Sequence, residues 1–220
     1  MDRDAMTARR EHWESAYRAK PVEELTWYQD TPRVSLAMIR ATGLRAAGRI
    51  LDVGGGASTL VDHLLDAGYE NLSVLDFSEA GLNRARQRLG RRAGRVRWIT
   101  ADVTEWRAPH RVDLWHDRAV FHFLTEPTDR DAYLAVLRQS LEPRGHLILS
   151  SFALDGPEKC SGLPVRRYDS EAFGALLGGE FSLRDSQYED HQTPAGVVQK
   201  FITCRFRRLA TDDQAGARDA

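Results

Sequence analysis

Three consecutive glycines, Gly54, Gly55 and Gly56, follow directly after the short apolar run RILDV. Glycine allows the backbone to adopt positive φ and allows a ligand to approach the main chain closely. A glycine turn between a buried strand and a helix is typical of sheets that bind nucleotides. A tight turn with no ligand is the alternative that other residues must exclude.

Acidic residues accompany this turn on successive apolar runs. Asp52 lies within the first run, Asp76 ends the expected second strand in LSVLDFS, and Asp102 ends the expected third strand in RWITADV. Asp76 lies about 20 residues beyond the turn, where an acidic residue can accept hydrogen bonds from ribose hydroxyls. A helix-starting acid at Asp76 and a solvated loop acid at Asp102 are the simpler interpretations. Together the three carboxylates favour a nucleoside ligand that carries positive charge, and they disfavour a pyrophosphate.

Alternating segments predict the elements that hold these residues. Short apolar runs alternate with helical patterns at 58–67, 78–90 and 128–141, which indicates repeated βαβ units and a parallel sheet. Asp30 or Thr31 is expected to cap a further helix, and Ser58 or Thr59 the helix after the glycines. The last two runs, FSLRDSQYED and GVVQKFITCRFRR, lack a helix between them and predict an antiparallel hairpin. The predicted fold is an α/β, Rossmann-like three-layer sandwich with seven mostly parallel strands.

Composition limits the organisation and the partners of the chain. Its 220 residues, with a net charge of −1, suit one domain over 1–208 and provide no overall field for nucleic acid. A lid segment is expected at 1–30 and a flexible tail at 209–220. No apolar run approaches the ~20 residues of a membrane span. The two cysteines lie far apart and suggest neither a disulfide framework nor a metal site. We expect a cytoplasmic protein that is a monomer or a weak dimer.

Five segments, in order over residues 45–155, carry a family resemblance. LDVGGG resembles the glycine turn of class I S-adenosylmethionine-dependent methyltransferases, and VLDFS and TADV resemble their ribose and adenine segments. VDLWHDRAVFHFL is similar to their fourth strand and the short helix after it. LEPRGHLILSSF is similar to their fifth-strand entry. The resemblance implies a seven-stranded methyltransferase that binds S-adenosylmethionine.

The resemblance implies a role for each matching residue. The glycines would face the methionine part of the cofactor, and Asp52 would help to hold its amino group. Asp76 would bind the ribose hydroxyls, while Asp102 would accept from the adenine amino group. The Arg118 carbonyl would accept from the ammonium. The predicted cofactor-binding residues are Trp27, Asp52, Gly54, Gly55, Gly56, Asp76, Phe77, Asp102, Val103, Arg118 and Ala119.

The N-terminal segment adds an acceptor-side prediction. HWESAYRAK and ELTWYQ resemble the leader of thiopurine methyltransferase-like enzymes and of lysine methyltransferases that modify metabolic enzymes. The resemblance implies a lid over the cofactor, although the same aromatics could simply attach the first helix to the core. Trp13, Tyr28 and His191 are the candidate acceptor-binding residues.

Methyl transfer from a sulfonium is an in-line displacement, and it needs alignment and exclusion of water more than a catalytic group. A base is needed only if the acceptor must first lose a proton. His116 and His122 are the candidate bases, but packing of His122 on the short helix is the favoured alternative.

We predict transfer to a nitrogen, oxygen or sulfur atom of a small molecule, with protein lysine as the alternative acceptor. No Asn/Asp-Pro-Pro-Tyr follows the fourth strand, which argues against nucleobase amino groups. An NAD-dependent oxidoreductase fits less well, because Thr59 stands where its third glycine is expected. A non-catalytic binding module would be expected to lose the glycines and acids, and an aminopropyltransferase to carry an acidic loop after the fourth strand.

Overall fold

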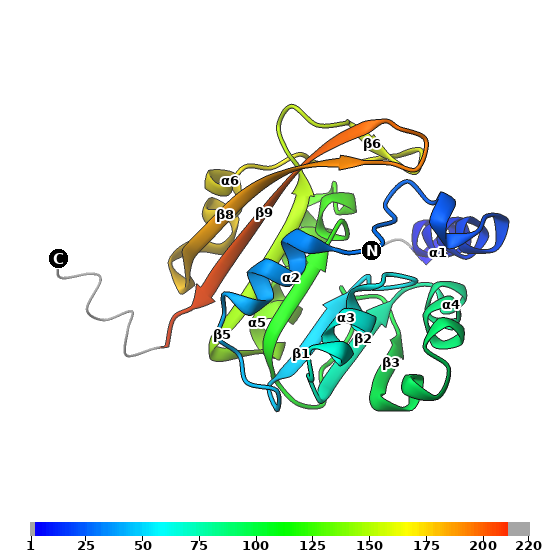
Figure 1. The fold of residues 1–220 in the computed structure, drawn as a ribbon. Helices are drawn as coiled ribbons and strands as arrows, with labels where there is room; N and C mark the ends of the chain where they lie inside the picture. Colours follow the sequence, from blue (N-terminus) through cyan, green and yellow to red (C-terminus); the bar gives the residue numbers. More distant parts are fainter. Residues whose placement is uncertain (1–2, 211–220) are drawn as a thin grey trace.

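The computed structural model describes residues 3–210, and a seven-stranded sheet lies at its centre (Figure 1). The strand order is β3-β2-β1-β4-β5-β9-β8. The strands are β1 Arg49–Val53, β2 Asn71–Asp76, β3 Val96–Thr100, β4 Val112–Arg118, β5 Leu141–Phe152, β8 Phe181–Gln192 and β9 Val198–Arg208. The predicted fold class and the predicted antiparallel hairpin at the end of the sheet are confirmed.

Helices cover both faces of the sheet, as the alternating pattern predicts. They are α1 Arg3–Ala19, α2 Arg33–Arg40, α3 Leu60–Asp66, α4 Glu79–Leu89, α5 Pro127–Ser140 and α6 Ser170–Leu177. Helices α2, α3 and α4 share one core cluster with the sheet, and α5 and α6 share the other. Helix α1 stands apart from both layers and lies beside α4 (Figure 1).

Side chains of the central strands alternate between these two cores. Ile50, Leu114 and Ile148 pack with α2 and α3, whereas their chain neighbours Leu51 and Trp115 pack with α5. All five are essentially inaccessible to solvent. Parallel strands that are buried on both faces read as continuous apolar runs, which is why RILDV and VDLW are recognisable in the sequence.

The order of the strands places the glycine turn. Strands β1 to β5 are parallel, and β1 lies between β2 and β4, so the chain runs outward in both directions from the β1–β4 pair. Ligands of such sheets bind outside the carboxyl ends of the strands, at the point where the order reverses. The turn after Val53 lies at that point.

Of two predictions about helix starts, one is wrong and the other is right in part. The N-cap residue of α2 is Pro32, with no side-chain cap, so neither Asp30 nor Thr31 caps it. Thr59 is the N-cap residue of α3 and the Ser58 hydroxyl accepts from the Leu60 amide at 3.1 Å, but the Thr59 hydroxyl donates to the Gln29 carbonyl at 2.8 Å. That bond joins the glycine turn to the N-terminal segment, which local sequence rules could not foresee.

The stretch between β5 and α6 contains an unpredicted element. Strands β6 Lys159–Cys160 and β7 Leu163–Pro164 form a two-stranded sheet of their own. Two residues per strand are too few to leave a readable pattern. This small sheet brings Cys160 toward the carboxyl ends of the main strands.

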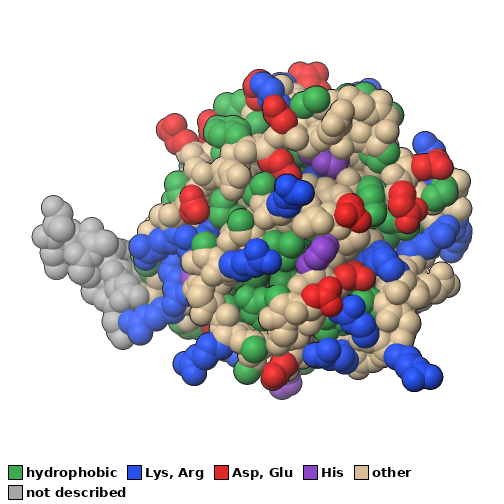
Figure 2. All heavy atoms as spheres, viewed as in Figure 1, with side chains coloured by type: hydrophobic (Ala, Val, Ile, Leu, Met, Phe, Trp, Pro, Cys, Tyr) green, Lys and Arg blue, Asp and Glu red, His purple; other side chains and the backbone are tan. Residues whose placement is uncertain are grey.

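Acidic and basic side chains are interspersed on the face drawn in Figure 2. Two arginines are paired with acids of α3: Arg88, in the last turn of α4, with Asp62, and Arg92, just after α4, with Asp66. Within residues 3–210, the search for a helix with the length and apolarity of a membrane span gives no candidate. The predicted flexible tail, apart from 209–210, lies outside the described residues.

Candidate active site

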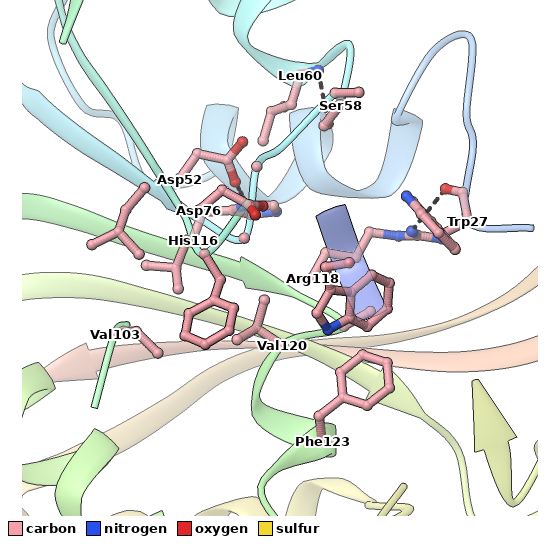
Figure 3. A pocket seen from close by; sticks show the side chains of 18 of the residues that line it. Trp27, Asp52, Ser58, Leu60, Asp76, Val103, His116, Arg118, Val120 and Phe123 are labelled. Atoms are coloured by element: carbon pink, nitrogen blue, oxygen red, sulfur yellow. Dashed lines mark hydrogen bonds and ion pairs between the residues drawn. The ribbon is translucent and has the colours of Figure 1, made fainter. Parts of the chain in front are cut away.

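A large cavity opens at the carboxyl ends of the central strands, against the segment that leads into α2 (Figure 3). With its open mouth included, the empty space is about 1330 Å³, which is ample for a nucleoside-sized ligand. The predicted site residues that line it are Trp13, Trp27, Tyr28, Asp52, Gly54, Gly55, Asp76, Phe77, Asp102, Val103, His116, Arg118 and Ala119.

The glycine turn forms one wall of this cavity. Gly54 has φ +67°, and a Cβ atom there would overlap the side chain of Val120. The amide of Gly54 donates to the Leu75 carbonyl at 2.7 Å, which ties the turn to the end of β2. Both the left-handed φ and the lack of space therefore require glycine at this position.

Asp76 lies beside this turn at the end of β2 and is almost completely buried. Its Oδ1 accepts from the Ser78 amide at 2.8 Å. Burial, with a further contribution from the nearby Asp52 carboxylate, raises the pKa of Asp76 to about 7. Burial thus makes a charged carboxylate costly at this strand end, which is the arrangement expected where ligand hydroxyls would complete its hydrogen bonds.

Asp52 belongs to a buried polar chain that crosses from β1 to α2. Its Oδ1 lies 2.7 Å from Nδ1 of His116, and Nε2 of the same ring lies 2.9 Å from the Ser35 hydroxyl. The other carboxylate oxygen, Oδ2, is buried without a hydrogen-bond partner. A buried, unpartnered carboxylate oxygen at the cavity wall is an acceptor available to a cationic ligand group.

Asp102 follows β3 and is less enclosed than the other two acids. Its Oδ1 accepts from the amide and the hydroxyl of Thr104, at 2.8 and 2.6 Å. These bonds fix the loop that presents Val103 to the cavity. The carboxylate therefore has a structural task in addition to any contact with a ligand.

A second buried network fixes the end of β4. Asp117 accepts from the Tyr133 hydroxyl at 2.6 Å and from the amide of Val120 at 2.9 Å. Between Asp117 and Val120 in the chain, Ala119 has φ +68°, an uncommon conformation for a residue with a Cβ. The Asp117 bonds hold that strained turn in place, so that the main chain of Arg118 and Ala119 faces the cavity.

Aromatic side chains of the N-terminal segment close the opposite side. Trp13 of α1 makes edge contacts with Trp27 at 5.4 Å and with Phe123 at 5.1 Å between ring centroids. Tyr17 is buried, packs against Trp27, and has its hydroxyl next to Gly56 and Asp76. The segment therefore contributes cavity wall in addition to docking α1 on the core.

The Arg118 side chain also reaches this side of the cavity. Its Nη1 donates to the Trp27 carbonyl at 3.3 Å, and its guanidinium carbon lies 4.4 Å from the centroid of Phe201 (Figure 3 shows Arg118 directed toward Trp27). The Nε and Nη2 atoms are buried without a partner. Burial lowers the pKa of Arg118, and the neighbouring Glu189 opposes that shift.

Three predicted site residues do not line the cavity. His122 is fully buried with neither ring nitrogen hydrogen-bonded, and burial lowers its pKa to about 3. It packs against Phe123 and Phe152, which agrees with the packing interpretation, and its role as a base stays a prediction that this placement does not favour. Nε2 of His191 donates to the Thr26 carbonyl at 2.8 Å, so this residue supports the leader. Gly56 is covered by Tyr17.

His116 does line the cavity, but both of its ring nitrogens are engaged, one with Asp52 and one with Ser35. This geometry suits a residue that orients Asp52 better than one that takes a proton from an acceptor. Its candidacy as a base stays a prediction that the arrangement does not favour.

Some cavity residues were missed by sequence reasoning. The side chain of Arg118, the hydroxyl of Ser35 and the thiol of Cys160 belong to no local motif. The arginine was assigned only a backbone role because the family resemblance concerns its carbonyl. Burial raises the pKa of Cys160 to about 12, so the thiol is neutral at physiological pH.

Comparison with known proteins places this site in a family. A model of the methyltransferase domain matches residues 50–145, which run from β1 into β5 and include the glycine turn and all three acids. The match covers somewhat less than half of the chain and agrees with the resemblance to class I S-adenosylmethionine-dependent methyltransferases.

The methyltransferases to which this chain is similar have varied acceptors. A malonyl-[acyl-carrier protein] O-methyltransferase of Anoxybacillus flavithermus is 34% identical over 104 residues, which are 47% of this chain and 38% of the relative. The ubiquinone/menaquinone biosynthesis C-methyltransferase UbiE of Teredinibacter turnerae is 26% identical over 78% of this chain and 74% of its own length. The chain thus spans less than half of the first relative and about three quarters of the second.

The fold is shared with solved methyltransferase structures. One is the Burkholderia thailandensis 1,6-didemethyltoxoflavin-N1-methyltransferase, with its bound substrate and S-adenosylhomocysteine. It aligns with a TM-score of 0.74 at 23% identity, over 94% of this chain and 90% of that one. The likeness of the leader to thiopurine methyltransferase remains a prediction.

Proposed function

We propose that this methyltransferase transfers the methyl group of S-adenosylmethionine to a nitrogen, oxygen or sulfur atom of a small molecule. The observation that carries the proposal is the cavity at the β1–β4 switch point, where the glycine turn meets the carboxylates of Asp52 and Asp76. The known relatives named above act on small or carrier-bound acceptors, which supports the same class here.

The residues of the cavity fit the cofactor. Gly54 and Gly55 line the cavity, so a ligand would lie against the main chain of the turn. The unpartnered Oδ2 of Asp52 suits the ammonium of the methionine part, directly or through a water. Asp76 would accept from the two ribose hydroxyls, and Phe77 and Val103 would flank the adenine. The bound cofactor would supply a methyl group on a cationic sulfur.

The protein's own part is binding and alignment. Trp13 and Trp27 would exclude water from the reacting atoms, because they wall the cavity on the side of the leader. No histidine in the described part of the chain is placed as an unengaged base at the cavity wall. An acceptor that is already deprotonated or a free amine is therefore the best match to this site.

Calorimetric titration with S-adenosylhomocysteine, with NAD titrated in parallel, tests the cofactor assignment. We expect saturable binding of S-adenosylhomocysteine alone. Binding of NAD instead would overturn the proposal, and binding of neither would favour a degenerate binding module.

The acceptor class is tested with methyl-labelled S-adenosylmethionine and a cell extract separated into small-molecule and protein fractions. Label in the small-molecule fraction is expected. Label on lysine of a protein would support the alternative acceptor that the sequence analysis kept open. The cytoplasmic location, the single domain over 1–208 and the monomeric or weakly dimeric state remain predictions from the sequence.

A further inference from the structure

We infer that the acceptor of this methyltransferase carries a carboxylate on an aromatic body, and that the Arg118 side chain recognises that carboxylate. The inference rests on the proposed function, because it concerns the acceptor end of the same cavity. Three observations identify Arg118. Two of its side-chain nitrogens have no hydrogen-bond partner, the residues around it do not neutralise its charge, and the acids of the cavity lie at the other end.

The two unpartnered nitrogens of Arg118, Nε and Nη2, lie on the same edge of the guanidinium group. A guanidinium offers Nε and Nη2 along one edge as two parallel donors, and it is Nη1, on the other side, that bonds to the Trp27 carbonyl. One edge with two free donors matches the two oxygens of a carboxylate. A buried guanidinium without an anion is unfavourable, so a bound carboxylate would satisfy an existing deficit.

The residues around Arg118 position this edge of the guanidinium without neutralising its charge. Phe201 supports the guanidinium from one side at 4.4 Å. The Glu189 carboxylate interacts favourably with the charge of Arg118. Its Oε1 nevertheless accepts from the Gln29 amide at 2.8 Å, and within the described residues it forms no ion pair with Arg118. The neighbouring Cys160 thiol stays protonated, because its pKa is raised to about 12.

Charge along the cavity wall separates two ends. Asp52 and Asp76 lie at the end formed by β1 and β2, where a cationic cofactor would be held. Two arginines line the cavity within the described chain, and one of them, Arg9, is already paired with Asp129 at 3.1 Å. Arg118 is therefore the available cation, and its position beside Trp27 identifies the end that would bind an anion.

The rings near Arg118 specify the body of the acceptor. Trp13 meets both Trp27 and Phe123 edge to face at the cavity wall. Such a wall favours a planar, apolar body, which aromatic rings provide. The protein encloses the free edge of Arg118, so the leader that supplies the Trp27 carbonyl would shift slightly as the carboxylate enters.

Calorimetry on protein saturated with S-adenosylhomocysteine tests the inference at neutral pH. The probes are two acids and their uncharged amides: benzoate with benzamide, and indole-3-acetate with indole-3-acetamide. We expect at least one acid to bind roughly ten-fold or more tightly than its amide, which is the scale of a charge-assisted bidentate pair.

Variants assign that preference to the side chain. Arg118→Gln should remove the preference for the acid, and Arg118→Lys should retain only a small part of it, because lysine lacks the two-donor edge. Arg84→Gln is the matched control. Arg84 also donates to a carbonyl of the leader, Tyr17, at 3.3 Å, but it does not line the cavity. The control should keep the preference for acids.

The outcomes separate this inference from the proposed function. If wild-type protein fails to bind S-adenosylhomocysteine, the proposed function is overturned. If it binds S-adenosylhomocysteine but treats each acid and amide alike, or if Arg118→Gln keeps the preference, the carboxylate inference is overturned. Should Arg118→Gln not fold, the wild-type comparison and Arg118→Lys still decide the question.

Discussion

The two ends of the cavity are built in different ways. The end at β1 and β2 consists of residues close to one another in the sequence, from Asp52 to Asp76, on neighbouring parallel strands. The end at Arg118 is assembled from α1, the leader, the turn after β4 and the small β6–β7 sheet. The first end is rigid scaffold carrying carboxylates, and the second is an aromatic wall with one unpaired cation.

This difference has a functional consequence. A cofactor common to a whole family can be bound by one conserved kind of strand-end geometry, whereas the acceptor varies and is recognised by segments added around that geometry. Changes at the first end should therefore reduce cofactor binding. Changes at the second should alter acceptor recognition and leave cofactor binding nearly intact.

The largest effect is expected for Asp76→Ala. Two ribose hydroxyls would lose their shared carboxylate acceptor, and charge-assisted hydrogen bonds contribute ~1.5–3 kcal/mol each to an interaction. Affinity for S-adenosylhomocysteine should fall about 100-fold, as measured by calorimetry. Asp155→Asn is the control, since Asp155 is an exposed partner of Lys200 away from the turn. Retained affinity in the Asp76 variant would disprove the ribose assignment.

His116→Leu should cause the next largest effect, on stability. It leaves the buried Oδ1 of Asp52 and the Ser35 hydroxyl without their partner. Leaving a buried carboxylate without its hydrogen-bond partner costs on the order of 3 kcal/mol, which lowers the melting temperature by roughly 6–12 °C for a chain of this size.

The matched control for that variant is Thr203→Val. Its hydroxyl donates to Ser150 at 2.7 Å in another buried pair, which is uncharged and lies between β5 and β9. A loss of about 1 kcal/mol is expected there. Equal losses in the two variants would mean that the Asp52–His116 contact is an ordinary hydrogen bond with no buried charge.

Sequence reasoning performed differently at the two ends for a physical reason. The fold, the glycine turn and the three strand-end acids follow from local patterns, because a buried parallel strand and its turn impose residue types over a few positions. The side chain of Arg118 carries no such local mark. Its free edge is visible only after Trp27, Phe201 and Glu189, which are distant in the sequence, are brought around it.

The leader offers a milder test of the comparison. Trp13→Ala removes a ring that touches Trp27 and Phe123 at the acceptor end. Because aromatic contacts contribute ~0.5–1.5 kcal/mol beyond area burial, affinity for the best-bound carboxylate probe should fall roughly 10-fold. Affinity for S-adenosylhomocysteine should change less than about 3-fold in the same variant. An equal loss of affinity for both ligands would contradict the proposal that the cavity has separate cofactor and acceptor ends.

The raised pKa of Asp76 predicts a pH-dependent difference in stability. The folded-state value of about 7 exceeds the ordinary value of 3.8, so the folded protein binds the proton more tightly. Stability from this group is complete below pH 3.8 and is lost as pH rises toward 7. Unliganded wild type should therefore become less stable relative to Asp76→Asn over this range, by on the order of 3–4 kcal/mol.

Thermal melts of both proteins from acidic to neutral pH measure this difference. The pKa values of His122 and His146 are lowered to about 3 and about 4, so these residues act in the opposite sense, with stability rising as pH rises. Their contributions are shared by both proteins and cancel in the comparison. A constant difference across the range would show that Asp76 titrates at its ordinary pKa.

The smallest effect is expected for His122→Leu. The ring is fully buried, makes no hydrogen bond through either nitrogen, and lies between Phe123 and Phe152 outside the cavity lining. Leucine replaces it with an apolar side chain of similar size, which removes two unsatisfied buried nitrogens and should leave stability unchanged or slightly higher. Once an acceptor is in hand, the methyl-transfer rate and its pH profile should stay within about 3-fold of wild type, since a group held neutral away from the cavity cannot exchange a proton with the acceptor. A large loss of rate with cofactor binding intact would return His122 to the reaction. It would also place the division between the two ends of the cavity elsewhere, because the short helix after β4 would then take part in chemistry as well as in packing.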